Sequence, residues 1–208
     1  MVAIVDYGVG NLFSLVSSFA AIGVEAEASG DPAFLLGASR LVLPGVGAFG
    51  DAAKALRDSG LQEVVLEAVK KGTPLLGVCL GMQLLLEKSF EYGEHPGLGL
   101  IPGQVRPIAE TILPELKIPH IGWNALHFVN KPCPLFRDLR EGEYVYFVHS
   151  YAGTGCGEAT AAVTEYSAPL TAAVWKDNVY GCQFHPEKSG PVGLRILRAF
   201  CSKEVEGC

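Results

Sequence analysis

Basic residues are scarce at the start of this sequence, where no lysine or arginine precedes Arg40. Across the 208 residues, 16 Lys and Arg stand against 22 Asp and Glu, which gives a net charge of −6. Nucleic-acid-binding proteins carry a basic arm or patch, so we expect no nucleic-acid partner. The missing basic N-terminal region, and Asp6 directly after the first apolar run, also argue against a secretory signal. The sequence therefore predicts a cytoplasmic protein.

Long apolar runs and paired cysteines are missing as well. The longest uncharged stretch, 7–24, contains three glycines, three serines and an asparagine, whereas a membrane span needs about 20 predominantly apolar residues. We expect no membrane segment. The cysteines form no CxxC pair and no regular spacing, so neither a zinc site nor a disulfide framework is indicated, and free thiols are expected. The six are Cys79, Cys133, Cys156, Cys182, Cys201 and Cys208.

Hydrophobic residues make up 49% of the chain, enough for a sizeable core, and no linker or repeat divides it. We expect a single domain over 1–208. In the first half, short apolar runs alternate with helical patterns, which predicts a parallel sheet with helices on both faces. Strands are expected at 1–7, 24–28, 41–43 and 74–78, and helices from 12 after an Asn11 cap, at 51–59, at 61–71 and at 80–87.

The second half has a different pattern, in which short Gly, Pro and Asn turns separate apolar segments typical of antiparallel strands. The predicted fold is α/β, with a mostly parallel central sheet flanked by helices and a smaller antiparallel portion. Gly193, Ile196, Leu197 and Phe200 are expected on the inner face of a closing helix over 192–202. The strands are expected at 118–129, 143–149, 159–165, 172–175 and 179–184.

One cysteine lies in a pattern suited to catalysis. Gly77-Val78-Cys79-Leu80-Gly81 has the small-x-nucleophile-x-small form of a nucleophile elbow. Such a turn lifts the thiol clear of the backbone and places it at a helix N-terminus, which favours the thiolate. From this motif alone, an inert buried cysteine at a strand end is an equally good interpretation.

A thiol nucleophile needs a base and an oxyanion site. His185 and Glu187 follow an apolar strand and lie two residues apart, so they could act as base and orienting carboxylate. A structural histidine and a solvated glutamate are the alternatives. The glycine-rich turn at 44–48 could supply oxyanion-binding N–H groups or be an ordinary turn. The segment 6–11 lacks the third glycine of a dinucleotide fingerprint, because Phe13 stands there.

Six separated blocks then resemble the class I, or triad, glutamine amidotransferases, and within them the glutaminase subunits of histidine biosynthesis. Together they span nearly the whole chain, and six in order are far more specific than one. The blocks are DYGVGN at 6–11, PGVGAFG at 44–50, GVCLGMQ at 77–83, IPHIGWN at 118–124, YFVHSY at 146–151 and FHPEKSG at 184–190.

The resemblance implies hydrolysis of glutamine to glutamate and ammonia through a cysteine thioester, without a cofactor or a metal. Cys79 would be the nucleophile, His185 the general acid and base, and Glu187 its orienting partner. The backbone N–H groups of Val46 and Leu80 would form the oxyanion hole. The glutamine substrate would be held by Gly47, Gln83, Glu91, Ser150 and Tyr151.

The resemblance also implies a heterodimer with a (β/α)₈, or TIM-barrel, cyclase subunit that uses the ammonia. Pro119, Trp123, Tyr146 and Lys188 match positions near that interface, with core packing as the alternative for each. We further expect the oxyanion hole to form only when the partner binds its nucleotide. Three other interpretations stay open: the glutaminase of another amidotransferase, a catalytically silent subunit on the same scaffold, and a cysteine peptidase or hydrolase.

Overall fold

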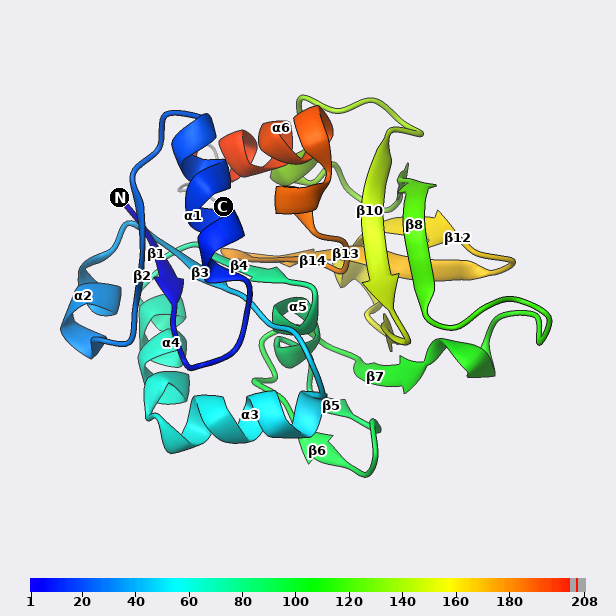
Figure 1. The fold of residues 1–208 in the computed structure, drawn as a ribbon, viewed down its shortest axis with the longest axis horizontal. Helices are drawn as coiled ribbons and strands as arrows, with labels where there is room; N and C mark the ends of the chain where they lie inside the picture. Colours follow the sequence, from blue (N-terminus) through cyan, green and yellow to red (C-terminus); the bar gives the residue numbers. More distant parts are fainter. Residues whose placement is uncertain (203–204, 206–208) are drawn as a thin grey trace.

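An eight-stranded sheet crosses the molecule and is covered by helices on both faces (Figure 1). The structure is a computed structural model and describes residues 1–202 and 205. Five neighbouring strands are parallel and three are antiparallel, which confirms the expected fold class. In spatial order they are β2 (Ala26–Ser29), β1 (Val2–Val5), β3 (Arg40–Leu43), β4 (Leu75–Val78), β14 (Val179–Cys182), β13 (Pro169–Lys176), β12 (Thr160–Glu165) and β9 (His127–Phe128).

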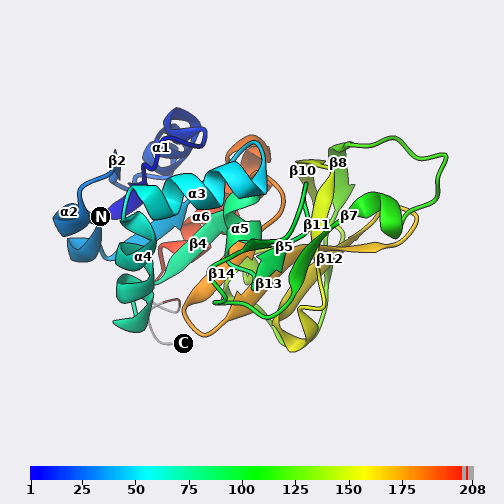
Figure 2. The same ribbon diagram turned by 90° about the horizontal axis from the view of Figure 1, so that it is seen from below.

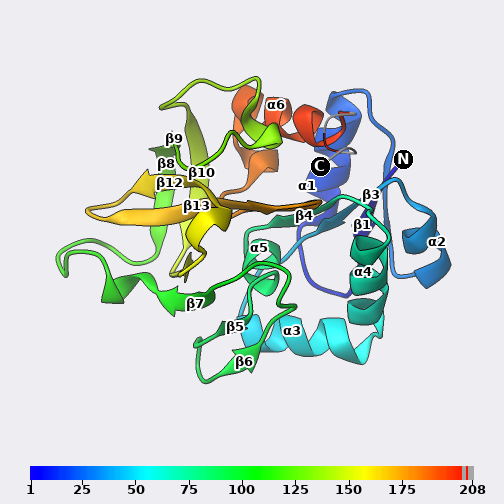
Figure 3. The ribbon, with the colours of Figure 1, turned by 180° about the vertical axis from the view of Figure 1, so that it is seen from behind.

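Helices on each side of the sheet explain why its central strands are apolar on both faces. Every residue of β1, β3, β4 and β14 is buried, as expected where parallel strands are covered twice. α1 (Leu12–Ala21) and α6 (Gly190–Phe200) cover one face, and α3 (Phe49–Asp58), α4 (Leu61–Lys70) and α5 (Leu80–Leu84) cover the other (Figures 1 and 3). α2 (Pro32–Gly37) packs against α4.

Two smaller sheets lie beside the antiparallel end of the main sheet (Figure 2). One pairs β8 (His120–Ala125) with β10 (Tyr144–His149) in antiparallel register. The other has the order β11-β7-β5-β6. Its strands are β11 (Tyr151–Thr154), β7 (Gln104–Pro107), β5 (Lys88–Ser89) and β6 (His95–Pro96), and short 3₁₀ helices are found at Ile108–Glu110, Pro134–Phe136, Gly157–Ala159 and Pro186–Lys188.

Several local predictions are confirmed. Asn11 caps α1 by accepting a hydrogen bond from the Ser14 backbone N–H at 3.4 Å. The expected inner face of α6 is buried. The described cysteines, Cys79, Cys133, Cys156, Cys182 and Cys201, are free thiols, and Cys208 lies outside the described residues. No helix within 1–202 has the length and apolar character needed to cross a membrane.

Several predicted elements have different bounds in the structure, and two of these differences have a clear cause. The expected strand 118–129 is two strands in different sheets, because the buried Leu126 between them turns into the core and donates its N–H to Glu143 O. The expected helix 80–87 ends at Leu84, because the carbonyls that would continue it accept hydrogen bonds from residues 98–101 instead. α2 and strands β5, β6, β7 and β11 were not predicted.

The turn from β4 into α5 has no room for a side chain at its glycines. A Cβ at Gly81 would lie 1.9 Å from Leu43 O on β3, and one at Gly77 would lie 2.7 Å from Gly81 O. Contacts this short require the backbone to move. The close approach of three backbone segments therefore fixes glycine at both positions.

We predict that Gly81→Ala lowers the free energy of unfolding by about 3 kcal/mol, the upper end of the usual range for overpacking. Urea denaturation measures the effect. The control is Gly37→Ala at the end of α2, where a Cβ meets nothing within 4 Å, and we expect it to be neutral or slightly stabilising. Equal effects of the two substitutions would contradict the packing argument.

Candidate active site

Cys79 lies at the sharp turn between β4 and α5. Its backbone has φ 55° and ψ −112°, a conformation that residues with a side chain rarely adopt. Such strain costs about 1–3 kcal/mol and persists only where the surroundings impose it. Here the Cys79 N–H donates to Cys182 O on β14 at 2.7 Å, and the glycine contacts described above hold the turn. The geometry is that of a nucleophile elbow.

His185 and Glu187 lie just beyond the end of β14, the strand next to β4. His185 Nδ1 and Glu187 Oε1 are 2.8 Å apart, and both side chains are at most 4% exposed. The surrounding backbone is also held, because the His185 N–H donates to Tyr146 O and Ser189 Oγ donates to His185 O. The glutamate is therefore not a solvated loop charge but the buried partner of the imidazole.

The environment of His185 favours its charged form. Burial lowers the pKa of His185, but hydrogen bonds to Cys79 and Glu187, together with the charges of both groups, outweigh burial and raise this pKa to about 9. An imidazolium stabilised in this way can pair with a thiolate and later give its proton to a leaving group. The three residues thus have the geometry and electrostatics of a Cys-His-Glu triad.

A cavity of about 310 Å³ opens beside the triad. It brings together residues from β10, β11, α5 and the loops after β3 and β5, which lie far apart in the sequence. Pro119, Val148 and His149 also line it. The expected site residues that line the cavity are Val46, Gly47, Cys79, Leu80, Gln83, Glu91, Ser150, Tyr151 and His185.

Comparison with known proteins agrees with this geometry. A model of the family "Glutamine amidotransferase class-I" matches residues 3–203. The chain belongs to this family. It is similar to "Imidazole glycerol phosphate synthase subunit HisH" of Wolinella succinogenes, with 49% identity covering 97% of this chain and 98% of the relative. The subunit of the same name from Gloeobacter violaceus is 48% identical, with 97% and 89% covered.

Solved structures support the amidotransferase fold. The chain is similar to one described as "Crystal structure of glutamine amidotransferase", with a TM-score of 0.76 and 22% identity, covering 100% of both chains. It is also similar to a chain of PurLQS from Thermotoga maritima, with a TM-score of 0.74, 19% identity and 96% of each chain covered. At these identities the likeness concerns the fold alone.

In this amidotransferase, the glycine-rich loop after β3 packs directly against the turn that carries Cys79. A Cβ at Gly45 would lie 2.7 Å from Gly81 N, and Gly47 has a φ of +92°. Tyr7 Oη donates to Pro44 O at 2.7 Å, and burial raises the pKa of Tyr7 well above its usual range, so the donor stays protonated. Val46 is 45% exposed. The loop and the first residue of α5 thus meet at the cavity, where the oxyanion hole is predicted.

Glu91 has a structural contact that the sequence did not reveal. Its Oε2 accepts a hydrogen bond from the Phe49 N–H at 2.5 Å, at the N-terminus of α3. The residue in the N-cap position, Ala48, makes no such bond, so a carboxylate from 42 residues away completes the helix end and complements its dipole. Glu91 therefore anchors the loop after β5 to α3 beside the cavity.

His149 and Gln183 also belong to the site, although sequence reasoning assigned neither a role there. His149 lines the cavity, and Gln183 is fully buried beside Cys79. Burial lowers the pKa of His149 to about 4, helped by the charges of His120 and His185 and opposed by its hydrogen bond to the Tyr151 carbonyl. His149 is therefore neutral near pH 7. His149 lies inside the block at 146–151, which was its only signal, whereas Gln183 lies directly before the block at 184–190.

The residues expected at a partner interface lie around the β8–β10 sheet. Trp123 is 54% exposed, which excludes core packing, and its ring contacts half-buried Tyr146 edge to face. Pro119 and Lys188 are exposed. The same face exposes further apolar side chains, namely Ile118, Ile121 and Tyr144. A contiguous exposed apolar patch of this kind is typical of a protein-protein interface.

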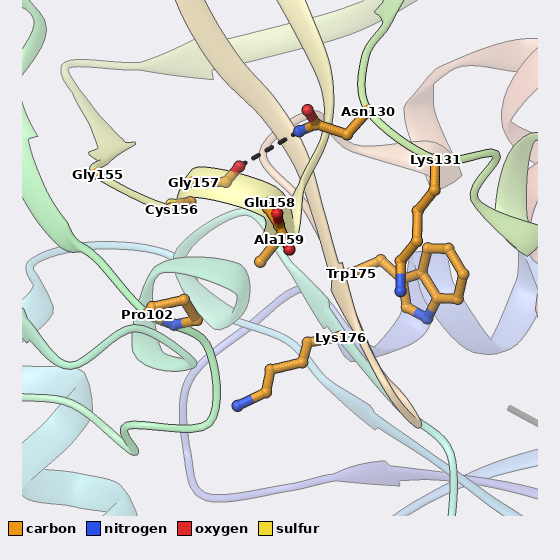
Figure 4. Close-up of a pocket in the computed structure, with 10 residues that line it drawn as sticks. All are labelled: Pro102, Asn130, Lys131, Gly155, Cys156, Gly157, Glu158, Ala159, Trp175 and Lys176. Carbon is orange, nitrogen blue, oxygen red and sulfur yellow. Dashed lines mark hydrogen bonds between the residues drawn. The ribbon is translucent and has the colours of Figure 1, made fainter.

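A larger cavity of about 630 Å³ lies elsewhere, between β13 and the loops around Asn130 and Gly155 (Figure 4). Its one thiol is that of Cys156, whose pKa burial and the charge of Glu87 raise to about 11. The described residues that line it include no histidine. Lys131 rests over the Trp175 ring at 4.1 Å from its centroid. Among its described lining residues this cavity therefore pairs no activated thiol with a histidine, and it shares no residue with the cavity at Cys79.

Two histidines make opposite contributions to stability as pH changes. The pKa of His185, about 9 in the folded chain, lies above the unfolded value of about 6.5, so its stabilising contribution is complete below about pH 6.5 and is lost as pH rises through about 9. The lowered pKa of His149 has the reverse effect. Its contribution is complete above about pH 6.5 and is lost as pH falls towards about 4.

We predict that Glu187→Gln lowers the pKa of His185 by about one pH unit or more, because the substitution removes a buried negative charge in contact with the ring. NMR titration of the imidazole signals measures the change. The signal of His149, with a pKa near 4, is the internal control and should move little. An unchanged His185 titration would show that Glu187 does not stabilise the imidazolium.

Proposed function

We propose that this chain is the glutaminase subunit of imidazole glycerol phosphate synthase, and that it hydrolyses glutamine and delivers ammonia to a cyclase subunit. The observation that carries the proposal is the Cys79, His185 and Glu187 triad beside a cavity large enough for an amino acid. Membership of the class I amidotransferase family and relatives at 45–49% identity that share one name support it. The continuous sheet and the family match over 3–203 support a single domain over 1–208.

In the proposed reaction, the Cys79 thiolate attacks the carbon of the glutamine side-chain amide. The backbone N–H groups of Val46 and Leu80 hold the resulting oxyanion. His185 gives its proton to the amide nitrogen, so the C–N bond breaks, ammonia leaves and a glutamyl thioester remains. His185 then takes a proton from water, which attacks the thioester and releases glutamate and the thiol. Glu187 orients the ring throughout.

The substrate is proposed to lie in the cavity with its amide at Cys79. Gly47, Gln83, Glu91, Ser150 and Tyr151 line this cavity and are proposed to hold the glutamine. The Glu91 carboxylate, which already accepts from the α3 N-terminus, would attract the substrate's ammonium group. No cofactor is needed for this chemistry, and no group of three or more His, Cys, Asp or Glu in the described part of the chain could hold a metal ion.

A partner follows from the product. Ammonia is largely protonated in neutral water, so the small amount released from glutamine serves as a nucleophile only when a dry path delivers it. We propose that the chain forms a heterodimer with a TIM-barrel cyclase and that this complex is cytoplasmic. The cyclase would bind the face that carries Pro119, Trp123, Tyr146 and Lys188. Pro119 also lines the catalytic cavity, which supports a direct route. The cyclase would make imidazole glycerol phosphate and an aminoimidazole carboxamide ribotide, in histidine biosynthesis.

The test is glutamate release from glutamine by the chain alone and with a cyclase subunit carrying its nucleotide. We expect low activity alone and a strong rise in the complex, because the Gly45 to Gly47 loop is expected to complete the oxyanion hole only then. Cys79→Ala should abolish glutamine-dependent turnover, a loss of about 10⁴-fold or more. The same complex should still make product from added ammonium salt.

Three results would count against the proposal. Equal rates of glutamate release with and without the liganded partner would contradict the proposed dependence on the partner. Normal glutaminase activity in Cys79→Ala would refute the nucleophile. Cleavage of peptides, with no release from glutamine, would favour a peptidase.

We predict that Trp123→Ala weakens cyclase binding by about 2 kcal/mol or more, because exposed aromatic anchors dominate interface energies. Isothermal calorimetry measures the affinity. The matched control is Phe13→Ala, which removes an aromatic ring that is 82% exposed on α1, an element outside the β8–β10 sheet. Similar losses in both variants would place the interface elsewhere.

A further inference from the structure

Two glutamine side chains meet behind the proposed nucleophile. Gln183 follows β14 and is completely buried, and its Nε2 lies 3.8 Å from Cys79 Sγ. Its Oε1 accepts a hydrogen bond from Gln83 Nε2 at 2.9 Å. Neither contact involves the His185–Glu187 pair, so the sulfur has a second polar neighbour besides the imidazole.

The orientation of both amides is fixed by a backbone carbonyl. Gln83 Nε2 also lies 3.1 Å from Tyr151 O, and a carbonyl oxygen only accepts, so the nitrogen of Gln83 must point there. Its second N–H then reaches Gln183 Oε1. Reversing either amide would set oxygen against oxygen or nitrogen against nitrogen. Gln183 therefore presents N–H, not oxygen, to the sulfur.

Neutral histidines hold that carbonyl in place. Tyr151 O accepts a second hydrogen bond, from His149 Nδ1 at 2.8 Å. Because His149 is neutral, its Nε2 is an acceptor, and His120 Nδ1, 3.0 Å away, donates to it. Asn124 Nδ2 in turn lies 3.4 Å from His120 Nε2. Each hydrogen bond in this series has only one possible direction. The Gln183 N–H that faces Cys79 is therefore preorganised.

We propose that Gln183 donates an N–H hydrogen bond to the Cys79 sulfur and stabilises its thiolate form. A thiolate accepts such a bond more strongly than a thiol, since charge strengthens hydrogen bonds. The amide offers nothing for an S–H group to donate to, which directs the thiol proton towards His185. The inference rests on the proposed nucleophilic role of Cys79. It adds a donor that does not titrate, next to a histidine that does.

The test is the rate of alkylation of Cys79 by iodoacetamide in the full chain, followed by mass spectrometry of the Cys79 peptide from about pH 5 to about pH 10. Gln183→Met keeps the side-chain length and removes the donor. We expect alkylation about 10-fold slower near neutral pH, the midpoint of the profile about one pH unit higher, and the same plateau at high pH. Gln104→Met, outside the cavity, is the control and should match the wild type.

Other groups that face the sulfur or line its cavity also titrate, namely Glu91, His149, Tyr151 and His185. They are unchanged in both variants, so a difference between the profiles is assigned to Gln183. An unchanged midpoint, or a rate lowered equally at every pH including the plateau, would overturn the proposal. The second result would mean a change of access rather than a lost hydrogen bond.

Circular dichroism checks that Gln183→Met folds. If Gln183→Met does not fold, Gln83→Met provides a second test. This variant keeps Gln183 but removes the hydrogen bond that orients the Gln183 amide, so we expect a smaller rise in the midpoint of the alkylation profile. An unchanged profile in that variant would contradict the proposal. Alkylation uses no glutamine and no partner, so this result is independent of whether the chain proves to be a glutaminase.

Discussion

The close approach of the α5 backbone to β3 is the constraint on which the site depends. With Gly81 against Leu43 O, the chain leaves β4 through a sharp turn in which Cys79 adopts a strained conformation. The neighbouring strands then place the remaining parts. The loop that follows β3 and the histidine that follows β14 both arrive at the same edge of the parallel sheet as Cys79. Three adjacent strands thus bring their carboxyl ends to the cavity at Cys79.

Electrostatics at this edge separates two histidines that are both buried. His185 has a carboxylate and a thiol as partners, and they raise its pKa despite burial. His149 has a carbonyl and a neutral histidine as partners, and burial lowers its pKa. The first can therefore carry a proton through the reaction, while the second serves as a fixed hydrogen-bonding element. Burial alone does not decide the role; the partners do.

Much of the fold, and the position of Cys79 in the site, could be predicted from local sequence patterns. The Asn11 cap, the buried face of α6 and the elbow around Cys79 each have a sequence signal within a few residues, and the structure confirms all three elements. Long-range contacts could not be predicted. The hydrogen bond from Phe49 to Glu91 joins residues 42 apart, and no spacing signals it. The split of the strand at 118–129 depends on Leu126 finding a place in a core built from other segments. The short α2, capped by Asp31, did carry a local signal that was overlooked.

The central claim is that Cys79 carries the glutamyl group during turnover. The most direct measurement is mass spectrometry of the chain, quenched in acid while it turns over glutamine in the presence of the cyclase subunit. The account predicts a glutamyl adduct on the Cys79 peptide that disappears when the glutamine is exhausted. An adduct on another cysteine, or turnover at full rate with no adduct on any cysteine, would contradict it.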